Sequence, residues 1–207
     1  QTDDAAWKDE IRDRPAPFAE FVSERCAFSL PSGFIRLLDN PTEVMTFWNT
    51  VVGHQDELGA MADLRKMPER INIDVQISAG LLHAGYPTQG PTSHGPPLVN
   101  TGELNQQGSW GWFHELGHEA QRRPDKSWGW DNVYTFDGAV EATVNIFTSV
   151  AYDKMGIADR GGWSWTATPI AVMERALDGL QGDATFASLG VGHKLAMFLQ
   201  LRDHWGW

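Results

Sequence analysis

The stretch WFHELGHEAQ, residues 112–121, places two histidines four positions apart, with a glutamate directly after the first. An α-helix has 3.6 residues per turn, so His114 and His118 lie on one face about one turn apart, where two imidazoles can reach a single metal ion. Glu115 is too close to His114 in sequence to serve as a convenient third ligand on that face. It is placed instead to touch a water held by the metal, which makes it the candidate general base.

A third ligand must come from elsewhere, because catalytic zinc typically takes three protein ligands and keeps a fourth position for water. Glu141 lies in GAVEATVNIF, a segment otherwise so apolar that a carboxylate there needs a partner or a metal. Two histidines and one glutamate are a ligand set of zinc peptidases, so the sequence predicts one zinc ion and hydrolysis of an amide bond. Asn145 follows Glu141 by one helical turn and is predicted to orient a ligand or contact substrate.

Other catalytic classes find no support in the sequence. No phosphate-binding G-x-x-x-x-G-K loop and no G-x-S-x-G elbow occur, and the lone Cys26 has no context typical of a nucleophile. The five histidines outside the motif have no comparable spacing and are interpreted as structural or exposed. The alternative interpretation of the motif itself is a surface helix whose histidines are there by chance.

Hydrophobic periodicity and turn formers predict an α+β fold around the motif. The first 38 residues suggest short strands and loops, and the Gly- and Pro-rich segment 79–97 suggests a loop. We expect a single metallopeptidase catalytic domain over 1–207, with a mixed α/β subdomain at 1–100, a helical subdomain at 101–207 and a ligand cleft between them. Helices are predicted at 41–64, 109–123, 138–156, 168–180 and 192–205, and a half-buried strand at 70–78.

Composition narrows the possible partners. The chain of 207 residues is 42% hydrophobic and 21% charged, as is typical of a folded domain. Its net charge of -11 and the lack of a Lys/Arg cluster disfavour nucleic acid and anionic membranes as partners. No apolar run reaches the length of about 18 residues needed for membrane insertion. Since the sequence starts at Gln1, we expect it to be an excerpt of a longer protein.

Several quoted segments resemble one known family. GSWGWFHELGHEAQ followed by YTFDGAVEATVNIF, together with RPAPFAEF, LDNP and DVQISAGLLHAGYP, is similar to the enhancin-like, mucin-directed zinc metallopeptidases of the gluzincin type, numbered sixty among the metallopeptidase families. The likeness covers most of the chain and implies a zincin-like fold. By this resemblance the metal ligands are His114, His118 and Glu141, and the general base is Glu115.

The resemblance also implies a substrate and a location. It predicts an endopeptidase that cleaves O-glycosylated, mucin-type glycoproteins and is extracellular or at the cell surface, in bacteria. The competing hypothesis is a non-catalytic glycan-binding or protein-interaction module that keeps a zincin fold. Loss of Glu115 or of a metal ligand would favour this hypothesis, and neither is lost here. Residues predicted near substrate or around the ligands are Trp112, Asp137, Asn145 and Tyr134, and candidate oxyanion donors are Tyr134, Tyr152 and His193.

Overall fold

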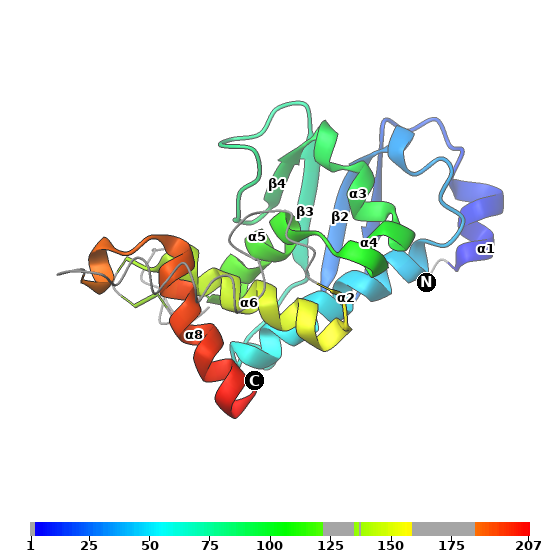
Figure 1. Cartoon of the computed structure of the whole chain (residues 1–207). Helices are drawn as coiled ribbons and strands as arrows, with labels where there is room; N and C mark the ends of the chain where they lie inside the picture. The colour runs from blue at the N-terminus through cyan, green and yellow to red at the C-terminus, as the bar shows by residue number, and fades with distance from the viewer. Residues whose placement is uncertain (1–2, 122–134, 137, 159–184) are drawn as a thin grey trace.

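A computed structural model describes residues 3–121, 135–136, 138–158 and 185–207, and Figure 1 shows the arrangement of their helices and strands. The elements confirm the α+β class predicted from the sequence. In chain order they are α1 (Asp4–Ala6), which continues as a π-helical turn (Trp7–Ile11), β1 (Phe18–Val22), β2 (Cys26–Pro31), α2 (Pro41–Leu58), β3 (Glu69–Asp74), β4 (Thr88–Pro91), α3 (Pro96–Val99), α4 (Thr101–Gln107), α5 (Trp110–Gln121), α6 (Val140–Met155) and α8 (Val191–Trp205), with short 3-10 turns at Ser32–Phe34, Thr92–His94 and Phe186–Ser188.

The four strands form one sheet in the order β1-β2-β3-β4. β1 pairs with β2 antiparallel, and β2, β3 and β4 run parallel to one another. The register places Phe21, Phe28, Ile71 and Thr88 in one row across the sheet, and all four are buried. Because side chains alternate between the two faces of a strand, this row marks the face that packs on the core.

Helix α2 packs against the sheet on one side and against α5 and α6 on the other. Trp48 on α2 makes edge-on ring contacts with Phe28 of the sheet and Phe113 of α5, at centroid distances of 5.9 and 5.7 Å. Gln55, one helical turn from the end of α2, donates to the backbone oxygens of Phe113 and Phe147 at 2.7 and 3.4 Å. The core is therefore continuous across the predicted division at residue 100, and that division stays a prediction.

The helix predicted at 41–64 begins with Pro41 as expected but ends at Leu58. Ala60 adopts the left-handed conformation (φ 52°), which carries the chain out of the helix, and Met61 N–H donates back to the oxygen of Asp56 at 2.7 Å. Gly59 fits this turn because a Cβ there would lie 2.9 Å from the backbone oxygen of Ala120 on α5. Contact with α5 thus sets the end of α2.

Two predictions around β3 were wrong in part. The strand stops at Asp74, before the predicted end at residue 78, and Val75 is 81% exposed. Segment 79–97 was predicted to be a loop, yet it contains β4, a 3-10 turn and the start of α3. The sequence of β4 is TQGP, which has little intrinsic strand propensity. Its strand conformation comes from pairing with β3 along Ile71–Asp74.

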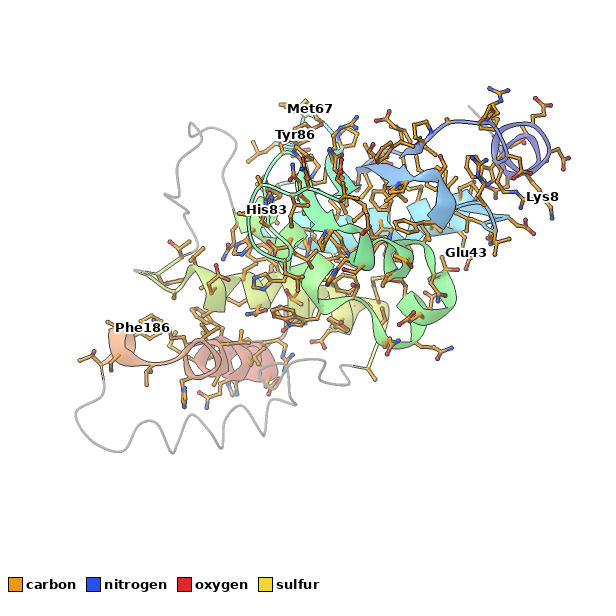
Figure 2. All side chains as sticks on the ribbon, turned by 90° about the horizontal axis from the view of Figure 1, so that it is seen from above. Lys8, Glu43, Met67, His83, Tyr86 and Phe186 are labelled. Atoms are coloured by element: carbon orange, nitrogen blue, oxygen red, sulfur yellow. The ribbon has the colours of Figure 1, made fainter. Side chains whose placement is uncertain are left out.

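The helices predicted in the second half are confirmed where the structure describes them. α6 ends at Gly156 in the left-handed conformation (φ 65°), as its glycine stop predicts, and α8 covers the helix predicted at 192–205. The predicted helix 168–180 lies outside the described residues. Figure 2 shows Lys8, near the N-terminus, and Phe186, ahead of α8, at opposite ends of the molecule. No helix among the described ranges is both long and apolar enough to cross a membrane.

Cys26, at the start of β2, is fully buried, and burial raises the pKa of its thiol to about 12. Only the thiolate reacts readily with alkylating reagents. A pKa about three units above that of a free thiol lowers the thiolate fraction at pH 8 on the order of a thousandfold. We expect iodoacetamide to modify Cys26 in urea at least that much faster than in the native protein, as followed by mass spectrometry. Similar rates in the two states would contradict the burial.

Candidate metal centre

The motif helix α5 and the following helix α6 pack closely side by side (Figure 1). Gly117, between the two motif histidines, faces α6: a Cβ at this position would lie 3.1 Å from Cβ of Phe147 and 3.1 Å from Cγ2 of Val144. The glycine therefore permits an approach that any larger residue would oppose. This approach places side chains of α6 directly over the face of α5 that carries His114 and His118.

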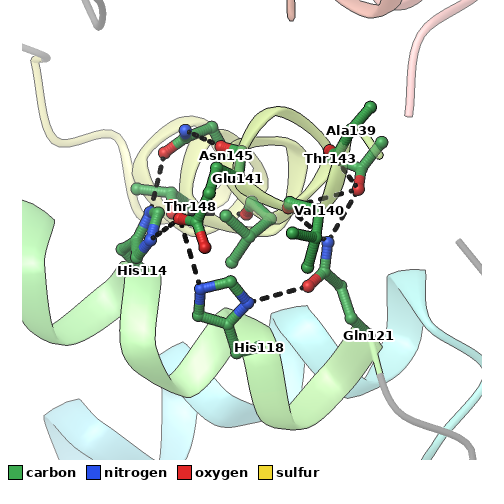
Figure 3. A network of polar contacts seen from close by, with 10 residues as sticks. His114, His118, Gln121, Ala139, Val140, Glu141, Thr143, Asn145 and Thr148 are labelled. Carbon is green, nitrogen blue, oxygen red and sulfur yellow. Dashed lines mark hydrogen bonds and ion pairs between the residues drawn. The ribbon is translucent and has the colours of Figure 1, made fainter. Parts of the chain in front are cut away.

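Three potential metal donors meet between the two helices (Figure 3). Oε2 of Glu141 lies 3.1 Å from Nε2 of His114 and 3.6 Å from Nε2 of His118, and one donor atom from each residue falls within 4.8 Å of the other two. A tetrahedral ion with bonds of about 2.0–2.1 Å holds its ligand atoms roughly 3.3 Å apart. The spacing and the donor types therefore fit a zinc-like ion. Both histidines are buried, whereas the Glu141 side chain is 54% exposed, which leaves the centre open on one side.

The amide of Asn145 fixes the orientation of the first histidine. Its Nδ2 donates to the backbone oxygen of Glu141 at 2.7 Å, so its Oδ1 faces Nδ1 of His114 at 3.1 Å. An amide oxygen only accepts, so Nδ1 of His114 carries the proton and, in the neutral ring, Nε2 presents a lone pair to Glu141. A lone pair and a carboxylate oxygen at 3.1 Å repel each other unless a cation lies between them. The arrangement is thus built for positive charge.

The electrostatics of the three donors lead to the same conclusion. When Nε2 of His114 and of His118 also carries a proton, hydrogen bonds from these atoms hold the pKa of the Glu141 carboxyl well below its usual value. Burial opposes charge on His118, but the Glu141 carboxylate outweighs it and raises the pKa of that imidazole. A negative carboxylate beside the His118 imidazole, which favours positive charge, makes a site where a divalent cation replaces protons.

Gln121 is a residue of the centre that sequence reasoning missed. Its Oε1 lies 2.9 Å from Nδ1 of His118, and its Nε2 donates to the backbone oxygen of Val140 at 3.0 Å and to Oγ1 of Thr143 at 2.7 Å (Figure 3). The available signal was its position three residues after His118, on the same helical face. Gln121 therefore contacts His118 as Asn145 contacts His114, with its amide oxygen facing Nδ1 of the ring.

Glu115 lies beside the donors and does not join them. Burial raises the pKa of its carboxyl, while the charges of His114 and His118 and a backbone hydrogen bond from Ala84 act in the opposite direction. One turn further along α5, Glu119 accepts from the N–H of Gly85 at 2.7 Å. Two carboxylates of the motif helix therefore hold the segment between β3 and β4, where Figure 2 labels His83 and Tyr86.

The two tryptophans ahead of the motif have different roles. The Trp110 ring packs on the His114 ring at a centroid distance of 4.6 Å and supports that donor from the side. Trp112 is 1% exposed, and its Nε1 donates to the backbone oxygen of His94 at 3.3 Å. Its ring leaves no open face for a ligand, so the structure gives it a packing role in place of the predicted substrate contact.

Of the four remaining predicted residues, the structure describes two. Tyr134 and Asp137 are outside the described residues. Tyr152 is buried against Phe113 at a centroid distance of 5.0 Å, and its hydroxyl donates to the backbone oxygen of Gln107 at 3.2 Å, so it does not face the donors. His193 lies in the first turn of α8, outside the three-residue cluster. Tyr152 therefore does not supply the predicted oxyanion donor, and the same role for His193 stays a prediction.

Comparison with known proteins places this centre in a family. The family model described as "Peptidase M60, enhancin and enhancin-like" matches residues 1–207. The chain belongs to the M60 peptidase family. This confirms the resemblance drawn from the sequence.

The relatives of this M60 chain include longer proteins that are named as channel-associated factors and not as peptidases. A TRPM8 channel-associated factor homolog from Danio rerio is 32% identical over 208 residues, which cover 100% of this chain and 22% of that protein. The chain thus spans about a fifth of the length of the curated relatives it matches.

Solved structures share the fold at low sequence identity. A functionally unknown conserved protein from Bacillus anthracis str. Ames, in a mutant form, superposes with a TM-score of 0.78 at 18% identity, over 98% of this chain and 41% of that one. A metallopeptidase in complex with Tn antigen superposes with a TM-score of 0.69 at 18% identity, over 98% and 37%. These likenesses support the fold that the chain shares with a metallopeptidase.

Proposed function

We propose that this M60 chain is a zinc-dependent endopeptidase that hydrolyses peptide bonds in O-glycosylated, mucin-type glycoproteins. The observation that carries the proposal is the convergence of His114, His118 and Glu141 on one point, with Glu115 beside them. A cluster that only stabilised the fold would have no need of a half-exposed carboxylate facing two imidazole lone pairs. A proton acceptor next to an open metal centre is the arrangement that peptide hydrolysis requires.

The chain's own residues divide the chemistry between them. His114, His118 and Glu141 would hold the ion, which when bound acidifies water and polarises the scissile carbonyl. Glu115 accepts a proton from the attacking water at its carboxylate and passes it to the leaving amine nitrogen. Its partial burial suits both roles, because a raised carboxyl pKa makes the protonated form a usable intermediate. The Ala84 N–H keeps the carboxylate in position.

The substrate class rests on family membership and on one structural neighbour. A metallopeptidase of the same fold forms a complex with Tn antigen, and enhancin-like proteins define the family model. We extend this glycan association to the present chain, together with an extracellular or cell-surface location. The net charge of -11 agrees with a partner other than nucleic acid.

A second candidate function follows from the names of the curated relatives. They are TRPM8 channel-associated factors, which suggests a module that binds a protein partner. Such a module would keep the fold and could bind a metal without turnover. The metal alone therefore does not separate the two functions, and a cleavage assay does.

The test combines metal removal with cleavage of a defined substrate. Zinc-loaded protein is incubated with an O-glycosylated mucin-type protein and with the same substrate after enzymatic deglycosylation, and fragments are identified by mass spectrometry. We expect cleavage of the glycosylated form only, loss of cleavage after treatment with a chelator, and recovery when one equivalent of zinc is added back. One bound equivalent of zinc without any cleavage would favour the interaction module instead. Equal cleavage of both substrates would reject the glycan requirement.

A further inference from the structure

We propose that Gln121 is a positioning residue of the metal centre that sets which ring nitrogen of His118 is available to the ion. The inference rests on the proposed function only for the identity of the ion. It concerns a fully buried side chain whose two polar atoms are both engaged: Oε1 with Nδ1 of His118 at 2.9 Å, and Nε2 with acceptors on α6.

The surroundings fix the direction of the Gln121 amide. The backbone oxygen of Val140 can only accept, so the atom facing it at 3.0 Å must be the amide nitrogen. The amide oxygen then faces His118 and, being only an acceptor, requires the proton to be on Nδ1. This leaves Nε2 as the nitrogen of His118 that can bind a metal, on the side of Glu141.

The same contacts give the Gln121 side chain a second role, which is to connect the two helices. Gln121 is the last residue of α5, and its amide nitrogen bonds to Val140 and Thr143 in the first turn of α6, the turn that carries Glu141. Asn145 makes the reverse connection, from α6 to His114. Each histidine is thus oriented by an amide that also holds the two ligand-bearing helices together. Partners of this kind commonly change metal affinity by about 10- to 100-fold when removed.

The experiment measures zinc affinity of the folded protein by competition with a chromophoric chelator. Gln121→Met keeps the size of the side chain and removes its hydrogen bonds, and we expect it to weaken zinc binding by about 10- to 100-fold. Gln121→Glu keeps an acceptor against Nδ1 of His118 but loses the donor to Val140, so we expect it to bind zinc more weakly than the wild type and at least about threefold more tightly than Gln121→Met. Rescue by the glutamate distinguishes orientation of the histidine from a general packing role.

Gln55 offers a matched control. It is also a buried glutamine whose amide contacts α5, through the backbone oxygen of Phe113, yet it touches no metal donor. Gln55→Met is expected to lower Tm, as Gln121→Met does, while leaving zinc affinity within about threefold of wild type. Equal affinity loss in both methionine variants, or none in Gln121→Met, would overturn the assignment.

One measurement needs no variant and covers the case in which Gln121→Met fails to fold. Long-range ¹H–¹⁵N spectra of the zinc-loaded wild-type protein should show His118 protonated at Nδ1 and bound to the metal through Nε2. Coordination through Nδ1 would overturn the proposal. Because none of these readouts involves cleavage, absence of peptidase activity would reject the proposed function and leave this inference standing.

Discussion

Glu115→Gln is expected to lower kcat/KM for the glycoprotein substrate by about 10²–10⁴-fold, the usual contribution of a general acid–base residue. Glutamine has the shape of glutamate and still accepts a hydrogen bond from the Ala84 N–H, but it cannot take a proton from water. The protein should therefore fold and bind zinc as before. The measurement is kcat/KM, alongside zinc content and Tm.

Glu103→Gln is the matched control for this variant. Glu103 lies on α4, is exposed, and its side chain interacts with Asn100 and Gln107 rather than with the donors. It should retain wild-type activity. If Glu115→Gln kept more than about a tenth of wild-type activity, its role as general base would be rejected. Loss of zinc from the same variant would instead assign the carboxylate to metal binding.

Asp56→Ala is expected to lower the free energy of unfolding by about 3–5 kcal/mol, the cost of leaving buried charge without its partner. Asp56 is fully buried in α2, where its carboxylate accepts from Nη1 of Arg25 at 3.1 Å and from Nε of Arg65 at 2.7 Å. Without it, Arg25 and Arg65 lose the carboxylate that they share, and only Arg65 keeps a buried partner, Glu69. Urea denaturation of the metal-free protein measures the loss.

An exposed ion pair supplies the comparison for Asp56. Glu20 on β1 accepts from Nη1 of Arg70 on β3 at 2.8 Å, with the Glu20 side chain 55% exposed. Solvent screens such a pair, so Glu20→Ala should cost only about 0–1 kcal/mol. A cost for Asp56→Ala in that same low range would show that burial of the Asp56 cluster adds nothing to stability.

Local signals made much of the fold predictable. Pro41 and Gly156 mark the start of α2 and the end of α6, and the alternation of Ile71 and Ile73 identifies β3. β4 could not be predicted, because its fold depends on a contact between distant residues. A Cβ on Gly90 would lie 2.6 Å from Cη2 of Trp112, so this glycine is needed only once the motif helix is packed against the strand.

The metal centre was likewise predictable from the sequence only in part. Residues within one helical turn of a donor were predictable by spacing, which is how Asn145 was chosen as a ligand partner. Gln121 has the same kind of spacing, three residues after His118, but the direction of its amide depends on the backbone oxygen of Val140, and a backbone atom leaves no signal in a sequence. Of the two roles predicted for Trp112, near substrate or around the ligands, burial excludes substrate contact, and the sequence could not show this for a related reason. An aromatic side chain next to a motif has the same periodicity whether it faces a cleft or the core.

Gly117 has a consequence for how the centre could be altered. Metal coordination tolerates deviations of only about 0.2 Å in its bond lengths, and the donors stand on two separate helices. A methyl group at Gly117 would meet Val144 and Phe147 at 3.1 Å, closer than such atoms normally approach. The distance between α5 and α6, and with it the spacing of the donor atoms, therefore depends on a residue with no side chain. A substitution at Gly117 could therefore change which metal the site prefers without changing any of the three donors.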